Sequence, residues 1–568
     1  MKREWNIVKN ANKYTRQYSV PPESSWNWVK KEYIDKAPIW CSVDLRDGNQ
    51  ALVVPMNLEE KLEYFQLLVD IGFKEIEVGF PAASDTEFVF LRTLIERDLI
   101  PDDVTIQVLT QSREHIIRRT FEALTGAKRA IVHLYNSTSI AQREQVFRKP
   151  KSEIMEIAVS GAELCQQLAT ETPGHFLFQY SPESFTGTEV EFALDVCNAV
   201  LDVWRPTAER PVIINLPSTV QLSLPHVYAS QIEYMSAHLR DRQHVIVSVH
   251  PHNDRGTGVA DAELAMLAGA DRVEGTLFGN GERTGNVDIV TLALNMFSHG
   301  VDPGLHFENL PEIQSVVERL TKMQVGKRHP YAGELVFTAF SGSHQDAIAK
   351  GMKWREEEER EYWTVPYLPI DPKDIGREYE GDIIRINSQS GKGGIGYLLE
   401  QKYGFDLPPR MREDLGYTVK GVSDRLQKEL SVDEIADIFT EQFVNLAEPI
   451  AFSDIKAEEG PGHPTTVTIH TNGRTRTIRG SGNGRLDAVS NALQASLGLQ
   501  YTNLTYKEHA LEVGSGSRAV AYISIEDPEG TTHWGCGIDT DIMNASIKAL
   551  FSAVNRMVVA MPAFVLQH

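Results

Sequence analysis

Two histidines, His250 and His252, stand on either side of one proline where a predicted strand ends. The run at residues 244–249 is mostly apolar or β-branched, which predicts a buried strand. Side chains alternate along a strand, so both imidazoles fall on one side. Two imidazoles on one side can bind one divalent cation, whereas the simpler alternative is a pair of solvated loop histidines. The choice depends on whether the chain supplies further ligands nearby.

The elements that must position these histidines are short apolar runs that alternate with helical patterns. The runs predict eight strands, at residues 39–43, 75–78, 104–109, 130–134, 176–179, 212–215, 244–249 and 272–276. Helical periodicity separates them, for instance at residues 58–71, 86–96, 152–169, 189–203 and 261–268. Eight strand–helix repeats over about 260 residues predict an α/β fold, the (β/α)8 TIM barrel. An open doubly wound sheet is the alternative, but no G-x-G-x-x-G follows the first strand.

A barrel of this kind carries its chemistry at the carboxyl ends of the strands. The first predicted strand runs into Asp47, the last runs toward Asn286, and the seventh supplies His250 and His252. A carboxylate, two imidazoles and an amide oxygen can converge on one cation and leave positions for substrate oxygens. Taken alone, Asn286 is equally compatible with capping the helix that follows it. Polar residues at nearly all the strand ends favour a metal-dependent site.

Composition places the chain among globular proteins of several domains. Its 568 residues are 42% hydrophobic and 24% charged, which indicates about three domains and no extended disorder. No apolar run approaches the ~18 residues of a membrane span, and the amino terminus lacks the apolar core of a secretion signal. A net charge of -22 argues against nucleic acid and anionic membranes as partners. Four separated cysteines without a CxxC pair favour a reduced, cytoplasmic compartment.

Three motifs of the chain resemble those of one enzyme family. They lie at residues 41–50 (CSVDLRDGNQ), 250–254 (HPHND) and 279–286 (GNGERTGN). Together they are similar to the acyl-CoA Claisen-condensing family, which includes 2-isopropylmalate, homocitrate and citramalate synthases. The resemblance covers nearly the whole chain, and it is closest to the longer bacterial type of 2-isopropylmalate synthase.

This resemblance implies a reaction and a set of residue roles. Acetyl-CoA would condense with 2-oxoisovalerate and water to give 2-isopropylmalate and CoA, the first committed step of leucine biosynthesis. A divalent cation, Mg2+ or else Mn2+ or Zn2+, would act on the keto oxygen, and a monovalent cation such as K+ could assist. The implied catalytic residues are Arg46, Glu183, His344 and Tyr379, the metal ligands are Asp47, His250, His252 and Asn286, and the pocket residues are Leu109, His133, Tyr135, Ser181, Pro217 and Thr219.

His344 lies beyond the barrel, between an apolar segment and a predicted helix. Judged from the residues alone, a histidine at a helix start suits a capping role. In the family, the matching histidine serves as the general base and, with a tyrosine that matches Tyr379, reaches the active site of the partner subunit. A histidine that is neutral near pH 7 suits that work. The resemblance therefore implies a homodimer.

The chain is predicted to divide into four regions. These are an N-terminal arm at residues 1–36, expected to pack on the body of the protein or on the second subunit of a dimer, the barrel at 37–304, helical linker subdomains at 305–445 and an α+β domain at 446–568. The α+β domain contains an internal repeat of two ββα-type units, whose glycines at 480 and 482 match those at 535 and 537. From sequence alone, these glycines suit plain turns as well as an anion site at the helix starts.

The resemblance further implies that this last domain binds leucine, the feedback inhibitor. The residues that match the family's effector-binding loops are Asn483, Gly484, His509, Ala510, Ala519, Gly537, Ile538 and Asp539.

Other functions remain open on the sequence. Homocitrate or citramalate synthesis would keep the barrel and the metal, because an apolar pocket wall discriminates one methylene by only ~1–3 kcal/mol. An acyl-CoA lyase would not need the long regulatory extension. A catalytically silent amino-acid sensor would keep the fold, but it would not need all six of Arg46, Asp47, Glu183, His250, His252 and His344.

Overall fold

The computed structural model describes residues 11, 13–339, 341–379, 396, 399–400, 402–426, 430–458, 460, 462–471, 473–511 and 517–561. The chain forms two compact units. The first comprises Met1–Val336 with Ile370–Glu378, and the second comprises Phe337–Pro369 with Tyr379–His568. The chain thus passes between the units inside the region predicted as a linker. The division into four regions stays a prediction.

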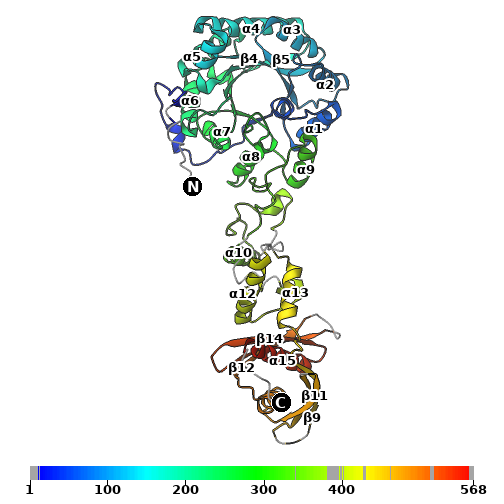
Figure 1. Ribbon diagram of the computed structural model, residues 1–568. Helices are drawn as coiled ribbons and strands as arrows, with labels where there is room; N and C mark the ends of the chain where they lie inside the picture. Colours follow the sequence, from blue (N-terminus) through cyan, green and yellow to red (C-terminus); the bar gives the residue numbers. More distant parts are fainter. Residues whose placement is uncertain are drawn as a thin grey trace. The chain divides into compact units, whose positions relative to one another are not determined.

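The first unit is a closed barrel of eight parallel strands in sequence order (Figure 1). This confirms the predicted (β/α)8 barrel. The strands are β1 (Ile39–Ser42), β2 (Glu75–Gly79), β3 (Thr105–Gln111), β4 (Arg129–Ser137), β5 (His175–Glu183), β6 (Val212–Ser218), β7 (Val245–Pro251) and β8 (Arg272–Gly275). Both β4 and β5 extend beyond the predicted runs, so polar residues expected in loops belong to the strands themselves.

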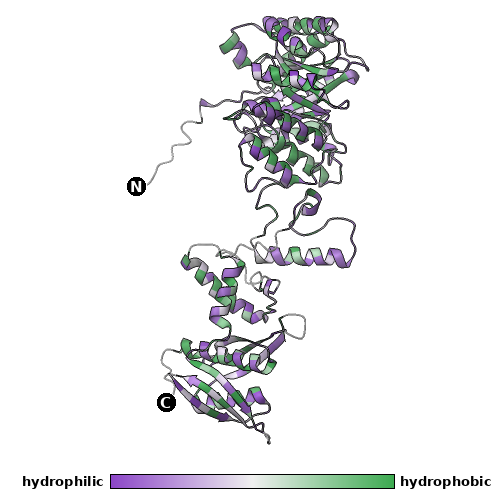
Figure 2. Cartoon of the chain, turned by 90° about the vertical axis from the view of Figure 1, so that its right-hand side faces the viewer, coloured by the Kyte–Doolittle hydropathy of each residue, from purple (hydrophilic) through white to green (hydrophobic). Residues whose placement is uncertain are grey.

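Helices surround the barrel, and those on the side seen in Figure 2 carry both apolar and polar residues. They are α1 (Leu58–Ile71), α2 (Asp85–Glu96), α3 (Glu114–Ala123), α4 (Lys151–Glu171), α5 (Val190–Trp204), α6 (Pro225–His238), α7 (Gly258–Leu267), α8 (Ile289–Phe297) and α9 (Leu310–Thr321). Local sequence fixes their ends. At the start of α1, for example, Asn57 and Glu60 form a reciprocal capping box. Among the described residues, no helix is long and apolar enough to cross a membrane.

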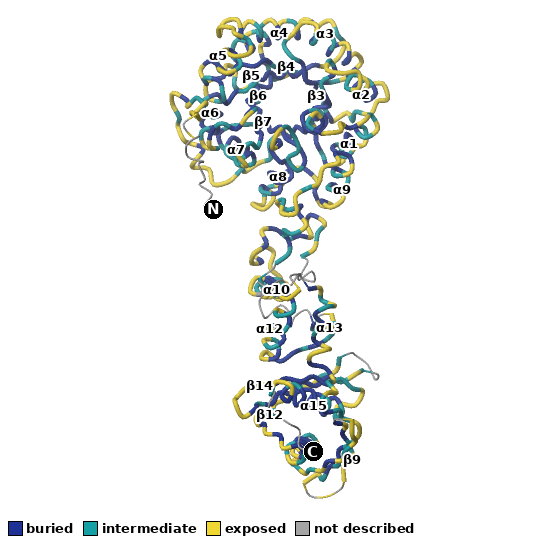
Figure 3. The backbone as a smooth tube through the Cα atoms, in the orientation of Figure 1, coloured by how far each residue is buried: buried dark blue, intermediate teal, exposed yellow. Residues whose placement is uncertain are grey.

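The strands are buried on both faces (Figure 3), yet the barrel interior is strongly polar. Glu274 of β8 is fully buried and accepts hydrogen bonds from Gln107 (3.0 Å), Gln179 (2.7 Å) and Arg272 (2.8 Å). Gln107 also donates to Glu77 of β2, at 3.0 Å. This buried network lies inside the strands whose carboxyl ends were predicted to hold the site.

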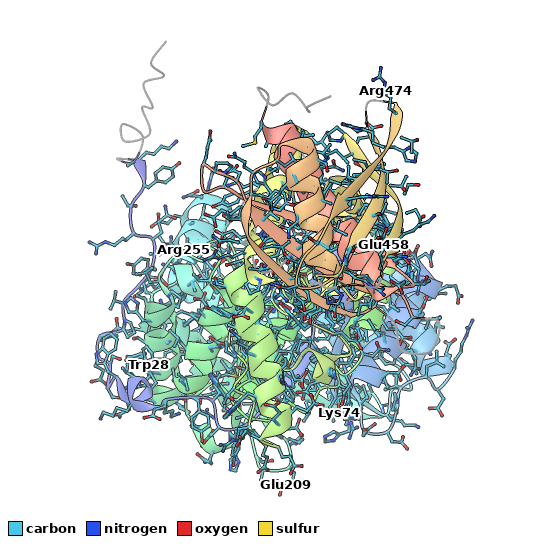
Figure 4. All side chains as sticks on the ribbon, turned by 90° about the horizontal axis from the view of Figure 1, so that it is seen from below. Trp28, Lys74, Glu209, Arg255, Glu458 and Arg474 are labelled. Carbon is cyan, nitrogen blue, oxygen red and sulfur yellow. The ribbon has the colours of Figure 1, made fainter. Side chains whose placement is uncertain are left out.

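The N-terminal segment packs on the outside of the same barrel. The carboxylate of Glu233 in α6 accepts hydrogen bonds from the hydroxyls of Ser24 and Ser25, both at 2.6 Å, and from backbone N–H groups of residues 25–27. Trp28, labelled in Figure 4, is buried beside it. Hydrogen bonds to Glu233 thus hold this part of the predicted arm against the barrel, and of its aromatic residues Trp28 is buried whereas Tyr14 and Trp26 are exposed.

The second unit contains helices α10 (Gly342–Glu357), α12 (Pro409–Leu426) and α13 (Val432–Phe443), followed by two three-stranded antiparallel sheets. One sheet holds β9 (Ile450–Ala457), β10 (Thr465–Thr471) and β11 (Arg474–Gly480), followed by α14 (Arg485–Leu497). The other holds β12 (Thr502–Ala510), β13 (Ala519–Glu526) and β14 (Thr532–Asp539), followed by α15 (Ile542–Ala560). The predicted repeat exists, and each copy has three strands, one more than the sequence indicated.

The glycines of the repeat allow close packing between strand and helix. A Cβ on Gly480 would lie 2.3 Å from the carbonyl oxygen of Ala488, and a Cβ on Gly537 would lie 1.9 Å from that of Ala545. Gly480 therefore corresponds to Gly537, whereas the sequence had matched it to residue 535. Because Gly537 lies within β14, the expectation that it forms a turn before the helix was wrong.

Replacing Gly537 with alanine should destabilise the second unit by about 3 kcal/mol, because the methyl group has to displace helix backbone. The matched control is Gly421→Ala in α12, where a Cβ meets nothing within 4 Å. There, the higher helix propensity of alanine should increase the free energy of unfolding by about 1 kcal/mol. Thermal unfolding of the full chain measures both. Equal transition temperatures for the two variants would contradict the packing role.

Candidate active site

The carboxyl ends of the barrel strands surround a cavity of about 360 Å³. It contains every pocket residue predicted from the sequence, together with Arg46, Asp47, Glu183, His250 and His252. The full lining is Arg46, Asp47, Gln50, Phe80, Leu109, His133, Tyr135, Ser181, Glu183, Asn215, Pro217, Thr219, His250, His252, Glu282 and Arg283. Strand register explains much of this convergence, since Leu109 pairs with His133, Tyr135 with Ser181, and Pro217 with His250.

Asp47, His250 and His252 form a compact buried triad. The carboxylate Oδ2 of Asp47 lies 3.2 Å from Nε2 of His250 and 3.6 Å from Nε2 of His252. Asn286 pairs through its backbone with His252, and its side-chain Oδ1 is buried without a hydrogen-bond partner among the described residues. One carboxylate oxygen, two imidazole nitrogens and an unused amide oxygen fit a divalent cation.

A short helical turn at Asp44–Gly48 places Arg46 and Asp47 at the cavity. The Gly48 N–H reaches back to the Val43 carbonyl at 3.1 Å, which makes this a wide, π-type turn, and such turns are frequent at functional sites. Asp44 anchors the turn from below, accepting hydrogen bonds from the hydroxyls of Ser42 and Tyr64, both at 2.8 Å. Burial raises the pKa of Asp44 to about 7.

Arg46 is held between two carboxylates. Its Nε donates to Glu77 at 2.5 Å, and its Nη1 donates to Asp47. Burial by itself would raise the pKa of Asp47, but the charges of Arg46, His250 and His252 outweigh it and hold that pKa well below its usual range. Asp47 is therefore ionised whenever the protein is folded, as a metal ligand has to be.

The two histidines of the triad differ in their surroundings. Nδ1 of His250 donates to Glu274 at 2.8 Å, which leaves Nε2 directed at Asp47. Burial disfavours the charged form of His250, yet the two carboxylates raise its pKa to about 9. His252 has no such support, and burial together with the charge of His250 lowers its pKa to about 4. These opposite shifts describe the triad with protons in place of a cation.

Beside the triad, hydrogen bonds fix the orientation of the predicted pocket residues. His133 bonds through Nδ1 to Glu77 and through Nε2 to the Ser181 hydroxyl, both at 2.7 Å. The Thr219 hydroxyl accepts a hydrogen bond from the Ser184 N–H at 2.9 Å, which leaves its own O–H to donate. Glu183 accepts from the Ser137 hydroxyl. The cavity thus combines a donor at Thr219 with an apolar wall at Leu109 and Pro217.

The buried residues that hold this site together were not predicted from the sequence. Glu77 and Glu274 lie in the middle of predicted strands, where Glu77 supports Arg46 and His133, and Glu274 supports His250. A carboxylate in the interior of a predicted strand was the available signal. Gln50, Phe80, Asn215, Glu282 and Arg283 also line the cavity and were not predicted to do so.

His344 and Tyr379 lie in the second unit, and their catalytic roles stay predictions. His344 is exposed in the first turn of α10. Its ring stacks on Tyr367, with centroids 4.0 Å apart and an interplanar angle of 21°. Tyr367, itself 61% exposed, was not singled out from the sequence.

The predicted leucine-binding residues fall into two groups within the second unit. Across β12, β13 and β14, Ala510 pairs with Ala519, and Ala519 pairs with Asp539. The next row joins His509, Val520 and Ile538 in the same way, and Gly537 follows. Asn483 and Gly484 instead line a cavity of about 720 Å³ at the start of α14, together with residues of β12 and α15.

Comparisons with known proteins match three family models to the chain. These are the HMGL-like model at residues 37–317, the model of the alpha-isopropylmalate synthase post-catalytic domain at 334–400, and the LeuA allosteric (dimerisation) domain at 429–558. The 2-isopropylmalate synthase of Desulfitobacterium hafniense is 67% identical over 97% of this chain and 99% of its own length. That of Helicobacter hepaticus is 61% identical over 96% of this chain and 99% of its own. Hydroxymethylglutaryl-CoA lyase of Pseudomonas aeruginosa, a solved structure, is 16% identical with a TM-score of 0.43, covering 52% of this chain and 97% of the lyase.

Substituting asparagine for Asp47 should weaken divalent-cation binding by at least ~100-fold, because the ionised ligand of the triad is lost. Competition between metal-free protein and a chromogenic chelator measures this affinity without any substrate. Glu282→Gln is the matched control, since it removes a carboxylate from the same cavity but outside the triad. Equal loss of affinity in both variants would point to general electrostatics rather than ligation.

Asp261 of α7 should make the stability of the barrel depend on pH. Its carboxylate accepts from Gln221 at 2.7 Å, and burial raises its pKa to about 7. The unfolded chain ionises this group near its ordinary pKa of 3.8. Folding thus favours the protonated form, and stability falls as pH rises from about 4 to about 7. In Asp261→Asn, the decrease in the free energy of unfolding between pH 4 and pH 8 should be smaller by up to about 4 kcal/mol. Urea unfolding at the two pH values measures this difference. A parallel pH profile in the variant would contradict it.

Proposed function

Because the chain belongs to the 2-isopropylmalate synthase family, we propose that it condenses acetyl-CoA with 2-oxoisovalerate and water to give (2S)-2-isopropylmalate and CoA. The observation that carries this proposal is the cavity in which Arg46 and the Asp47–His250–His252 triad adjoin Thr219 and an apolar wall. The family places this reaction in leucine biosynthesis.

Asp47, His250, His252 and Asn286 would hold the divalent cation, with Mg2+ first among the candidates. When bound, it supplies a Lewis acid for the keto oxygen of the 2-oxo acid. Glu274 keeps His250 with its proton on Nδ1, so that Nε2 stays available as a ligand. We also propose that a monovalent cation such as K+ assists the reaction.

Arg46 stabilises the alkoxide that forms when the keto carbon is attacked. Its guanidinium is fixed by Glu77 and Asp47 before substrate arrives, so no reorganisation is needed as the negative charge develops. The Thr219 O–H donates to the substrate carboxylate, while Leu109 and Pro217 face the branched side chain. Hydrolysis of the thioester then releases CoA and makes the condensation irreversible in practice.

His344 removes the proton from the methyl group of acetyl-CoA. An imidazole that is neutral at pH 7 suits this step, and the stacked ring of Tyr367 fixes its plane. Glu183 and Tyr379 complete the acid–base network. We propose that His344 acts in the active site of a second copy, as the family resemblance implies, so the working enzyme is a homodimer. The match to a dimerisation domain supports this assembly.

Leucine acts on this enzyme as a feedback inhibitor through the second unit. The LeuA allosteric domain match supports this regulation. We propose Asn483, Gly484, His509, Ala510, Ala519, Gly537, Ile538 and Asp539 as its binding residues. The coupling requires two states of the protein that differ in their affinity for leucine.

One assay tests the proposed function directly. Purified full-length protein is incubated with acetyl-CoA and a panel of 2-oxo acids, and free CoA is measured. Turnover should be highest with 2-oxoisovalerate and should stop when a chelator removes the divalent cation. Preference for pyruvate or 2-oxoglutarate would instead indicate citramalate or homocitrate synthesis. No turnover with any acid, while leucine still binds, would indicate a sensor.

Adding leucine to the same assay tests the regulatory proposal. Leucine should inhibit the wild-type protein, and Ala510→Phe should need at least ~10-fold more leucine, because the ring fills space for the isobutyl group. Ala510 is exposed, so the variant should fold. The same replacement at Ala451 of β9, in the other sheet, is the control. Unchanged inhibition of the Ala510 variant would remove this residue from the site.

A further inference from the structure

Two residues of the sequence motifs have no role in the chemistry above, and the structure pairs them with each other. Asp254 ends the HPHND motif after β7, and Arg283 lies in the GNGERTGN motif after β8. Nε of Arg283 donates to Oδ1 of Asp254 at 2.6 Å, and Nη2 donates to Oδ2 at 3.2 Å. This two-point contact fixes direction as well as distance.

The same ion pair reaches a third loop, the one that follows β6. Nη2 of Arg283 also donates to the backbone carbonyl of Thr219. The backbone N–H of Gln221 donates to Oδ2 of Asp254 at 3.1 Å. Close by, the N–H of Asn253 donates to the Gly285 carbonyl at 2.9 Å, which also joins the loops after β7 and β8. Three loops at the mouth of the barrel thus meet at one carboxylate and one guanidinium.

The backbone at Arg283 supports a specific role for this contact. Arg283 has φ +57°, in the left-handed region that residues other than glycine rarely adopt. Its side chain is 41% exposed and that of Asp254 16% exposed. An ion pair at this depth adds little to global stability. Its effect is local, because it holds Thr219 at the cavity wall.

We propose that the Asp254–Arg283 pair is the positioning element that presents Thr219 to the carboxylate of the 2-oxo acid. The inference rests on the proposed function, in which Thr219 binds that carboxylate. When the pair is broken, the loop after β6 loses two of its hydrogen bonds to neighbouring loops. The Thr219 hydroxyl then spends less time at the position that the substrate requires.

The sign of the change in KM distinguishes this proposal from a purely electrostatic effect. Asp254→Asn removes a negative charge next to a cavity that binds an anion, so electrostatics alone would lower KM for the 2-oxo acid. Loss of positioning raises it. The two explanations therefore predict opposite signs for the same variant.

The experiment measures kcat and KM of full-length Asp254→Asn, Arg283→Met and the double variant, with 2-oxoisovalerate and with acetyl-CoA. Each single variant should raise KM for the 2-oxo acid roughly tenfold, with kcat and KM for acetyl-CoA within about threefold. The double variant should be no worse than either single one, because both break the same contact. Arg283→Lys, which keeps one ionic contact, should restore part of the affinity.

Arg255→Met is the matched control, since it removes a guanidinium from the same loop at an exposed position labelled in Figure 4. It should leave both KM values within about twofold. A lower KM in Asp254→Asn, additive losses in the double variant, or an equal rise in the control would overturn the proposal. If either single variant loses its folding transition, the remaining one and Arg283→Lys decide by the same criterion. Absence of turnover in the wild-type protein would instead refute the proposed function itself.

Discussion

The carboxylate of Glu274 is the constraint on which the rest of the site depends. A negative charge at the centre of the barrel costs several kcal/mol unless donors surround it. Glu274 meets this requirement with Arg272, three amide side chains and His250. These five donors lie on five different strands, β3, β5, β6, β7 and β8. The barrel therefore has to close in its native register for the buried charge to be tolerated. Folding of the barrel and orientation of His250 are therefore one event.

A second carboxylate, Glu77, extends this arrangement to two side chains that line the cavity, Arg46 and His133. Gln107 joins it to Glu274, and Glu77 in turn orients Arg46 and His133. One hydrogen-bond network thus supports the metal triad, the guanidinium of Arg46 and the substrate pocket. Such preorganisation explains how a site that gathers so many charges can lie in a buried cavity without neutralising itself.

The hydrophobic periodicity of the chain and the polar residues at the ends of the predicted strands made most of the barrel and the triad predictable. Most of the eight strands stand out as short apolar runs, whereas β2 and β8 carry charged residues among few apolar ones. The geometry of the fold then assigns Asp47 and His250 to one end of the barrel. The supporting residues were not predictable in this way. Glu77 and Glu274 can be seen as charged residues within predicted strands, but the sequence does not reveal their hydrogen-bond partners. The glycines of the repeat misled for a related reason. A glycine signals a turn or a close approach, and only the helix backbone beside Gly537 distinguishes the two.

The hydrogen bonds of the cavity support the proposal that the base comes from the second unit. Both nitrogens of His133 are engaged, by Glu77 and by Ser181, and the remaining histidines of the lining belong to the metal triad. Glu183 already accepts a hydrogen bond from the Ser137 hydroxyl. Each imidazole that lines the described cavity is thus either hydrogen-bonded through both nitrogens or part of the metal triad. His344, exposed at the start of α10 and stacked on Tyr367, offers both of its nitrogens. This pattern is consistent with the proposal that His344 of the second unit is the proton acceptor, while the histidines of the barrel bind substrate and metal.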